Sequence, residues 1–197
     1  MPHLTVPEIP HLVPSAIEWL MQELPGVQRY LEFGAGGSTR LAASMGVPLI
    51  VSVESDPDFA QAVRDAVAGT PKSNVEVIHV DIGPIKAWGS PIDTSKKRTW
   101  WHYPTVGWDR FTGKSGPDLI VIDGRFRPAC FLLSLLRAAP GTKILFDDYA
   151  ERPAYKVVER FVEPTKMLGR SAVFFVPKQL DRPEVAKELE ISYFKPA

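Results

Sequence analysis

The sequence has 197 residues, of which 45% are hydrophobic and 23% charged, with 23 basic and 23 acidic side chains. A chain of this length buries about 70% of its unfolded surface, so we expect one soluble domain, residues 1–197, that needs no disulfide. The single cysteine excludes a disulfide framework, and the balanced charge gives no basic field for nucleic-acid binding. The sequence lacks a signal-peptide pattern and a membrane-spanning apolar run, so a cytoplasmic protein is expected.

Apolar runs, glycines and prolines predict that strands and helices alternate along the chain. The expected helices cover residues 15–24, 38–45, 56–68, 128–138, 153–161 and 183–189. The expected strands cover residues 27–33, 48–53, 75–80, 118–122 and 143–146, followed by a hairpin of residues 165–168 and 172–176.

Four of the first five strands are nearly continuous apolar runs, which is typical of strands covered on both faces. With helices between them, they predict an α/β fold. We expect a Rossmann-like, doubly wound, mostly parallel seven-stranded sheet with helices on both faces. The hairpin would form its antiparallel edge.

Acids or glycines follow the predicted parallel strands, where ligands bind in such sheets. They are Gly34 to Gly37, Glu54, Asp81, Asp123 and the pair Asp147-Asp148. Helix capping is the simpler explanation for any one of these acids. Because the pattern is repeated after all five strands, it favours a ligand site.

The glycine loop permits two kinds of nucleotide-type ligand. The dinucleotide motif G-x-G-x-x-G is incomplete, since Thr39 stands at its third glycine. Glu32, two residues before Gly34, would repel a pyrophosphate at the following helix N-terminus. A cationic ligand such as S-adenosylmethionine suits this carboxylate better.

The segment Glu32-Phe33-Gly34-Ala35-Gly36-Gly37 resembles the E/D-x-G-x-G motif of class I S-adenosylmethionine-dependent methyltransferases, and the resemblance covers about residues 27–176. It implies that Glu54 holds the ribose, that Asp81 lies near the adenine amine and that Glu32 orients the methionine ammonium. The implied cofactor-binding residues are Glu32, Gly34, Ala35, Gly36, Glu54, Ser55, Asp81 and Asp123.

The segments IVIDGRFRP and ILFDDYAERP resemble the metal-dependent, catechol-type O-methyltransferases. This resemblance implies that Asp123, Asp147 and Asp148 bind Mg²⁺, which would activate an acceptor hydroxyl. Helix capping and loop orientation are the alternative roles. The sequence departs from that family at Arg125 and Arg127, which replace an expected base; they suit an acceptor with a carboxylate or phosphate, or are solvated charges.

Residues 83–116 form a 34-residue segment that holds four of the five tryptophans, Trp88, Trp100, Trp101 and Trp108. Loops of this length are usually functional, so we expect it to cover the cofactor and an acceptor pocket. His102 or Tyr103 would then assist proton removal, and the expected catalytic residues are Asp123, His102 and Asp147. Alternatively, the segment packs on the protein's own surface or on a second subunit in a homo-oligomer, whereas a nucleic-acid contact through Lys96 to Trp101 is disfavoured.

The expected function is therefore methyl transfer from S-adenosylmethionine to a small molecule, at oxygen and with assistance from Mg²⁺. One alternative is a non-catalytic binding or assembly protein that keeps the fold. A nicotinamide-dependent oxidoreductase is the other, but it requires phosphate contacts at residues 36–39 that Glu32 disfavours.

Overall fold

The computed structural model describes residues 4–111 and 116–196, so residues 112–115 of the predicted insertion lie outside it. Its main sheet has seven strands in the order β3-β2-β1-β6-β7-β9-β8. The strands are β1 (Arg29–Phe33), β2 (Leu49–Glu54), β3 (Asn74–His79), β6 (Leu119–Ile122), β7 (Lys143–Phe146), β8 (Lys166–Leu168) and β9 (Ser171–Phe175). The first five strands in the sheet order are parallel, and β9 and β8 are antiparallel, which confirms the predicted fold class.

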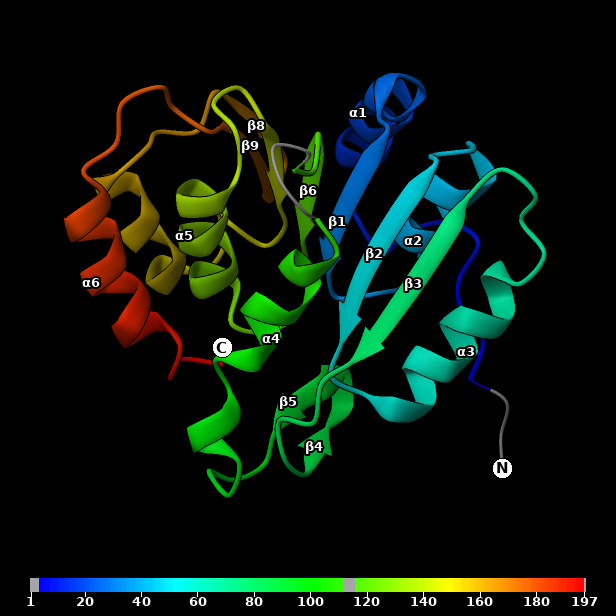
Figure 1. The fold of residues 1–197 in the computed structure, drawn as a ribbon, viewed down its shortest axis with the longest axis horizontal. Coiled ribbons are helices and arrows are strands. Elements are labelled where there is room, and N and C mark those ends of the chain that lie inside the picture. Colours follow the sequence, from blue (N-terminus) through cyan, green and yellow to red (C-terminus); the bar gives the residue numbers. More distant parts are fainter. Residues whose placement is uncertain (1–3, 112–115, 197) are drawn as a thin grey trace.

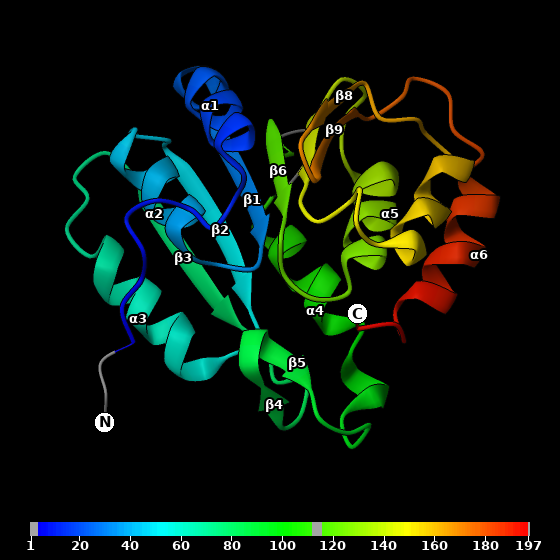
Figure 2. The ribbon, with the colours of Figure 1, turned by 180° about the vertical axis from the view of Figure 1, so that it is seen from behind.

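Helices cover both faces of this sheet. Figure 2 shows one face, with α1 (Pro14–Glu23), α2 (Gly37–Ser44) and α3 (Pro57–Val67), and a short 3₁₀ helix η1 (Leu24–Gly26) follows α1. The other face, seen in Figure 1, carries α4 (His102–Thr105), η4 (Val106–Arg110), α5 (Arg127–Arg137) and η5 (Pro153–Arg160), with α6 (Arg182–Ser192) packed on α5. No helix of the described residues has the length and hydropathy to cross a membrane.

The two faces of the sheet bury separate apolar clusters, as the continuous apolar strands predicted. In β6, Leu119 and Val121 face the cluster under α1 and α2, whereas Ile120 and Ile122 face the cluster under α5. All four side chains are fully buried. Burial of an aliphatic side chain stabilises the fold by about 1.5–3 kcal/mol, so this central strand fixes both layers.

The insertion fills the place of a helix between β3 and β6. It contains the hairpin β4 (Ile85–Lys86) and β5 (Ser90–Pro91), joined by η2 (Ala87–Gly89), and then η3 (Lys97–Thr99), α4 and η4. Trp100 and Trp108 are buried in the core, so this part packs on the chain's own sheet, one of the two predicted alternatives. The β4–β5 hairpin instead projects from the carboxyl ends of β2 and β3 (Figure 1), and Trp88 on it is 79% exposed.

His79, the last residue of β3, is partly exposed and lines a hollow at the end of that strand. The reason is topological, because β3 is the edge strand of the sheet and its outer side has no neighbouring strand to cover it.

The sheet has its topological switch point between β1 and β6. The helix after β1 passes to one face and the helix after β6 passes to the other, so the loops after these strands turn apart at the place where such sheets bind ligands. At its base the two chain segments touch through backbone: a Cβ on Gly34 would lie 2.5 Å from Gly124 N. Gly34 also has a φ of +97°.

We expect Gly34→Ala to destabilise the fold by more than the backbone conformation alone explains. The matched control is Gly69→Ala, because Gly69 has a φ of +80° but no atom within 4 Å of an added Cβ. The control should lose about 1–2 kcal/mol of unfolding free energy. Gly34→Ala should lose at least about 2 kcal/mol more, since two backbone segments must separate. Chemical denaturation measures both, and equal losses would contradict the close approach.

Candidate functional site

Glu32 lies beneath the glycine loop and has no exposed surface. Its Oε1 accepts a hydrogen bond from Tyr30 Oη at 3.0 Å, and its Oε2 accepts from Thr39 Oγ1 at 2.5 Å and Ser52 Oγ at 2.9 Å. Burial raises the pKa of Glu32, and these hydroxyl groups offset part of the rise. The carboxylate is therefore held within the protein, and it reaches a ligand only through the loop above it.

Thr39 connects this buried acid to the glycine loop. Its Oγ1 accepts from Gly36 N at 2.9 Å while its hydroxyl donates to Glu32. Thr39, which stands where the dinucleotide motif has its third glycine, thus fixes the glycine loop to Glu32. The sequence contained the signal, because a threonine three residues after Gly36 is in position for this kind of N-terminal helix cap.

Glu54 is the last residue of β2, and its two carboxylate oxygens have different surroundings. Its Oε1 accepts from the backbone N–H groups of Ser55 at 2.6 Å and Asp56 at 2.9 Å. Its Oε2 accepts no hydrogen bond from residues 4–111 and 116–196. This oxygen also keeps some exposed surface. Burial raises the pKa of Glu54, against the lowering effect of the two N–H groups. Oε2 is therefore free to accept from a ligand.

The hairpin of the insertion lies against Glu54 and Ser55. The Ser55 hydroxyl donates to the carbonyl oxygen of Gly89 at 3.2 Å. A Cβ on Gly89 would collide with Ser55 Oγ and lie 3.6 Å from Glu54 Oε1. The glycine therefore lets the β4–β5 hairpin approach the end of β2 closely.

Asp81 and His102 lie together at a different place from the switch point. Both line a hollow of about 290 Å³ beside the end of β3. Asp81 is exposed, and its carboxylate accepts from Gly83 N at 2.9 Å and pairs with Lys96 Nζ at 3.0 Å. The Gly83 N–H group and then Lys96 lower the pKa of Asp81. No hydrogen bond or ion pair in the described part of the chain joins His102 to Asp123 or Asp147.

Tyr103, the other predicted proton acceptor, reaches the base of the switch point. Its hydroxyl lies 3.3 Å from Arg125 N and would collide with a Cβ on Gly124. The side chain is fully buried, and burial followed by the charge of Glu54 raises its pKa well above the usual value. Tyr103 therefore keeps its proton at neutral pH and acts as a neutral hydrogen-bonding group.

The three predicted metal ligands do come together. Carboxylate oxygens of Asp123, Asp147 and Asp148 lie within 4.8 Å of one another. Asp148 has a φ of +56°, a left-handed conformation that aspartate tolerates better than most residues. The three side chains therefore lie at one position, at the ends of β6 and β7.

Two arginines occupy the space between these acids. Arg127 Nη2 lies 3.1 Å from Asp123 Oδ1 and 3.2 Å from Asp148 Oδ2. Arg170 Nη2 lies 3.0 Å from Asp147 Oδ2, and its Nε lies 2.9 Å from Asp148 Oδ1. Arg127 is buried by this pairing, so it is neither a solvated charge nor free to bind an acceptor.

This donor set does not fit a resident Mg²⁺. Both oxygens of Asp147 already accept hydrogen bonds, from Ser171 Oγ at 2.5 Å and from Arg170. Burial raises the pKa of Asp123 to about 8, with Arg127 opposing and Asp147 and Asp148 reinforcing the rise. A divalent cation would have to displace two guanidinium groups whose charge already balances the cluster.

Sequence reasoning missed Arg170 and the N-terminal segment. Arg170 lies in the β8–β9 turn, and the antiparallel pairing of Ala172 with Phe146 brings that turn beside Asp147. Its Nη2 also donates to the carbonyl oxygen of His11 at 2.7 Å. The predicted hairpin contained part of the signal for Arg170, but the register of β9 on β7, which fixes which residues meet, is seen only in the structure.

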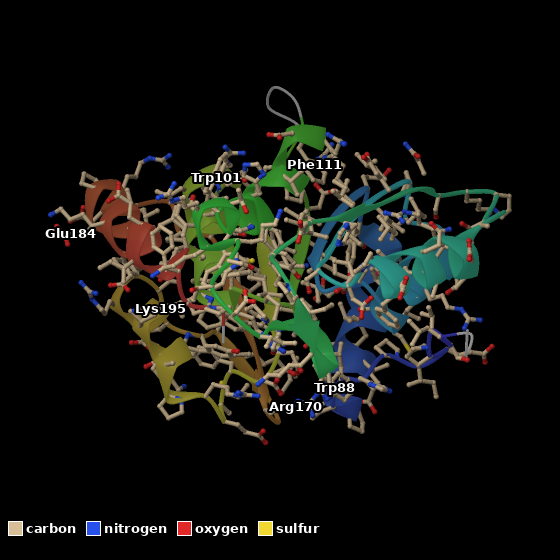
Figure 3. All side chains as sticks on the ribbon, turned by 90° about the horizontal axis from the view of Figure 1, so that it is seen from below. Trp88, Trp101, Phe111, Arg170, Glu184 and Lys195 are labelled. Carbon is tan, nitrogen blue, oxygen red and sulfur yellow. The ribbon has the colours of Figure 1, made fainter. Side chains whose placement is uncertain are left out.

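The N-terminal segment crosses the glycine loop, and no pattern in the sequence indicated this. A Cβ on Gly37 would lie 2.9 Å from Pro10 Cα. The His11 ring lies 6.0 Å from the ring of Trp88 on the hairpin. Figure 3, seen toward the carboxyl ends of β2 and β3, shows Trp88 and Arg170 close together, and both contact His11.

No family model and no curated protein sequence matches this chain. Solved structures match it. A methyltransferase-like protein from Silicibacter pomeroyi DSS-3 is 33% identical, with a TM-score of 0.85, over 96% of this chain and 100% of that chain.

Two more distant structures share the fold. The N-methyltransferase NodS from Bradyrhizobium japonicum WM9, in complex with S-adenosyl-L-homocysteine, is 13% identical, with a TM-score of 0.51, over 84% of this chain and 89% of its own. The tRNA (m1A58) methyltransferase TrmI from Aquifex aeolicus is 13% identical, with a TM-score of 0.50, over 89% of this chain and 72% of its own. The chain therefore belongs to the family of the methyltransferase-like protein from Silicibacter pomeroyi and has the class I S-adenosylmethionine-dependent methyltransferase fold.

Proposed function

We propose that this protein binds S-adenosylmethionine at the carboxyl ends of β1, β2 and β6 and methylates a small molecule. The observation that carries the proposal is the free Oε2 of Glu54. The backbone fixes Oε1, so the side chain is held in place before a ligand arrives and its second oxygen is available. A carboxylate oxygen in this position suits a ribose hydroxyl.

The other residues of the loop would position the rest of the cofactor. Glu32 and Thr39 fix the backbone at Gly36, and we propose that residues 34–36 pass along the methionine part. Glu32 has no exposed surface, so its effect on the ammonium group acts through the loop. Ser55 holds the hairpin near the nucleoside, and Asp81 borders the adenine side.

The bound cofactor supplies a methyl group on a sulfonium sulfur, which an acceptor attacks in line. The chain must align the acceptor and take up its proton. We assign the proton to Asp123, whose pKa near 8 lies close to neutral pH because of burial and the neighbouring carboxylates. Its Oδ1 pairs with Arg127, and the side chain is 26% exposed, so it stays accessible to an acceptor.

Magnesium has no part in this proposal. The expectation of an oxygen acceptor depended on the three aspartates as metal ligands. Since arginines pair with those aspartates, that expectation loses its support, and we propose a small molecule without assigning its accepting atom. The N-methyltransferase and tRNA methyltransferase neighbours share the fold with different acceptors, so the fold does not choose between them.

Calorimetric titration with S-adenosylhomocysteine tests the cofactor site. The wild-type protein should bind it, and Glu54→Gln should weaken binding about tenfold to hundredfold, because a charged hydrogen bond to the ribose is lost. Glu190→Gln on α6, an exposed position, is the matched control and should bind normally. Nicotinamide adenine dinucleotide should give no heat. If S-adenosylhomocysteine does not bind, the protein is a non-catalytic member of the fold.

Magnesium titration tests the aspartate cluster. We expect no saturable heat and no rise in melting temperature beyond that of sodium chloride at the same ionic strength. Asp147→Asn should lose about 1–3 kcal/mol of unfolding free energy, because buried hydrogen bonds to Ser171 and Arg170 are disturbed. A saturable magnesium heat that disappears in Asp147→Asn would restore the metal site.

A further inference from the structure

The three arginines around the switch point differ in their partners. Arg127 and Arg170 are paired with the aspartate cluster. Arg125 forms no ion pair with any residue in the ranges 4–111 and 116–196. Its Nη1 donates to Ser90 Oγ at 2.9 Å, while its Nε is buried and has no hydrogen-bond partner among the described residues.

A buried donor without a partner needs an explanation. Leaving such a group unsatisfied is unfavourable, and native proteins contain few of them. The guanidinium presents five N–H groups in a planar fork, whose geometry matches an oxyanion. Arg125 is therefore a cation that Ser90 holds in place and whose Nε has no acceptor among the described residues.

The position of Arg125 connects this donor with the proposed cofactor site. Arg125 follows Gly124, whose backbone touches Gly34 at the switch point. Its partner Ser90 lies on β5, directly after the glycine that approaches Ser55. The side chain of Arg125 thus reaches from the end of β6 to the hairpin.

The charges around Arg125 limit the kind of anion. Arg125 is the one guanidinium among these three arginines that can bind an anion, because Arg127 and Arg170 are paired with carboxylates. Asp123, two residues away, carries a further acidic group. This balance suits a monoanion better than a phosphate dianion. The Ser90 hydroxyl accepts from Arg125, so its own hydrogen is available for the same anion.

We propose that Arg125 and Ser90 form a carboxylate-binding subsite between the end of β6 and the β4–β5 hairpin. This inference rests on the proposed function, because the carboxylate belongs to a molecule bound there. Two sources share this chemistry, namely the amino-acid part of the cofactor and a carboxylate on the acceptor.

Calorimetry with three probes tests the subsite and separates its sources. S-adenosylhomocysteine carries the carboxylate, 5′-methylthioadenosine lacks the amino-acid part, and benzoate represents an acceptor carboxylate. If the cofactor is the source, Arg125→Gln weakens S-adenosylhomocysteine about tenfold to hundredfold and leaves methylthioadenosine unchanged. If the acceptor is the source, the variant keeps S-adenosylhomocysteine affinity but loses benzoate binding to that complex.

The controls keep the inference falsifiable. Arg98→Gln removes an exposed arginine of the insertion that carries Ser90. It should leave the affinities for all three probes unchanged. Ser90→Ala, which removes one hydroxyl, should weaken the same probe about threefold to tenfold and serves if Arg125→Gln fails to fold. Unchanged affinities in both variants would overturn the subsite.

Failure of the proposed function gives a different result. If the wild type binds neither adenosine compound, the cofactor site is wrong. Benzoate binding by the wild type that is lost in Arg125→Gln would still support the anion site. If the wild-type protein gives no binding heat with any of the three probes, both proposals are overturned.

Discussion

The contact between the backbones of Gly34 and Gly124 is the constraint on which the rest of the site depends. Any side chain at either position would enter the other segment, since a Cβ on Gly34 would lie 2.5 Å from Gly124 N. This closeness sets where the loops after β1 and β6 separate. It also brings Tyr103 against Gly124 from one face of the sheet, while Glu32 and Thr39 hold the glycine loop from beneath. Backbone packing and buried hydroxyl groups therefore hold the loops at this switch point in place.

Charge compensation decides the chemistry at the end of β7. Three carboxylates within 4.8 Å of one another would repel strongly if all were ionised and alone. A divalent cation is one solution, and a pair of guanidinium groups is another. Here Arg127 and Arg170 provide the second solution, and burial raises the pKa of Asp123 to about 8 against the lowering effect of Arg127. The same local sequence of aspartates can thus support a metal site or an ion-pair network. The arginines, which come from separate elements, determine which of the two forms.

The sequence predicted the sheet well because its information was local. Continuous apolar runs, Asp56-Pro57 at a helix start and the turn at Gly169-Arg170 each specify structure over a few residues. The convergence of Asp123, Asp147 and Asp148 also followed, since parallel strands end at one edge. The partners of these acids did not follow. Arg170 depends on the register of β9 on β7, and the contact of Pro10 with Gly37 depends on a long-range chain path. Within the insertion, composition could not separate the buried Trp100 from the exposed Trp88, because burial there depends on which side of the segment meets the sheet.

Three segments distant in sequence meet over the same edge of the sheet. The N-terminal segment crosses the glycine loop, the β8–β9 turn supplies Arg170, and the β4–β5 hairpin supplies Trp88 and Ser90. His11 joins the first of these to the other two, through its carbonyl oxygen and its ring. The left-handed φ of +66° at Trp88 shows that the hairpin accepts a strained backbone to place this ring. Glu54 lies under the hairpin, so these segments border the position at which we propose that the ribose binds. The hydrogen bond from Arg170 to His11 is exposed, whereas the glycine loop beneath is hydrogen-bonded to the buried Glu32 through Thr39. The glycine loop is therefore the more firmly held part of this edge of the sheet.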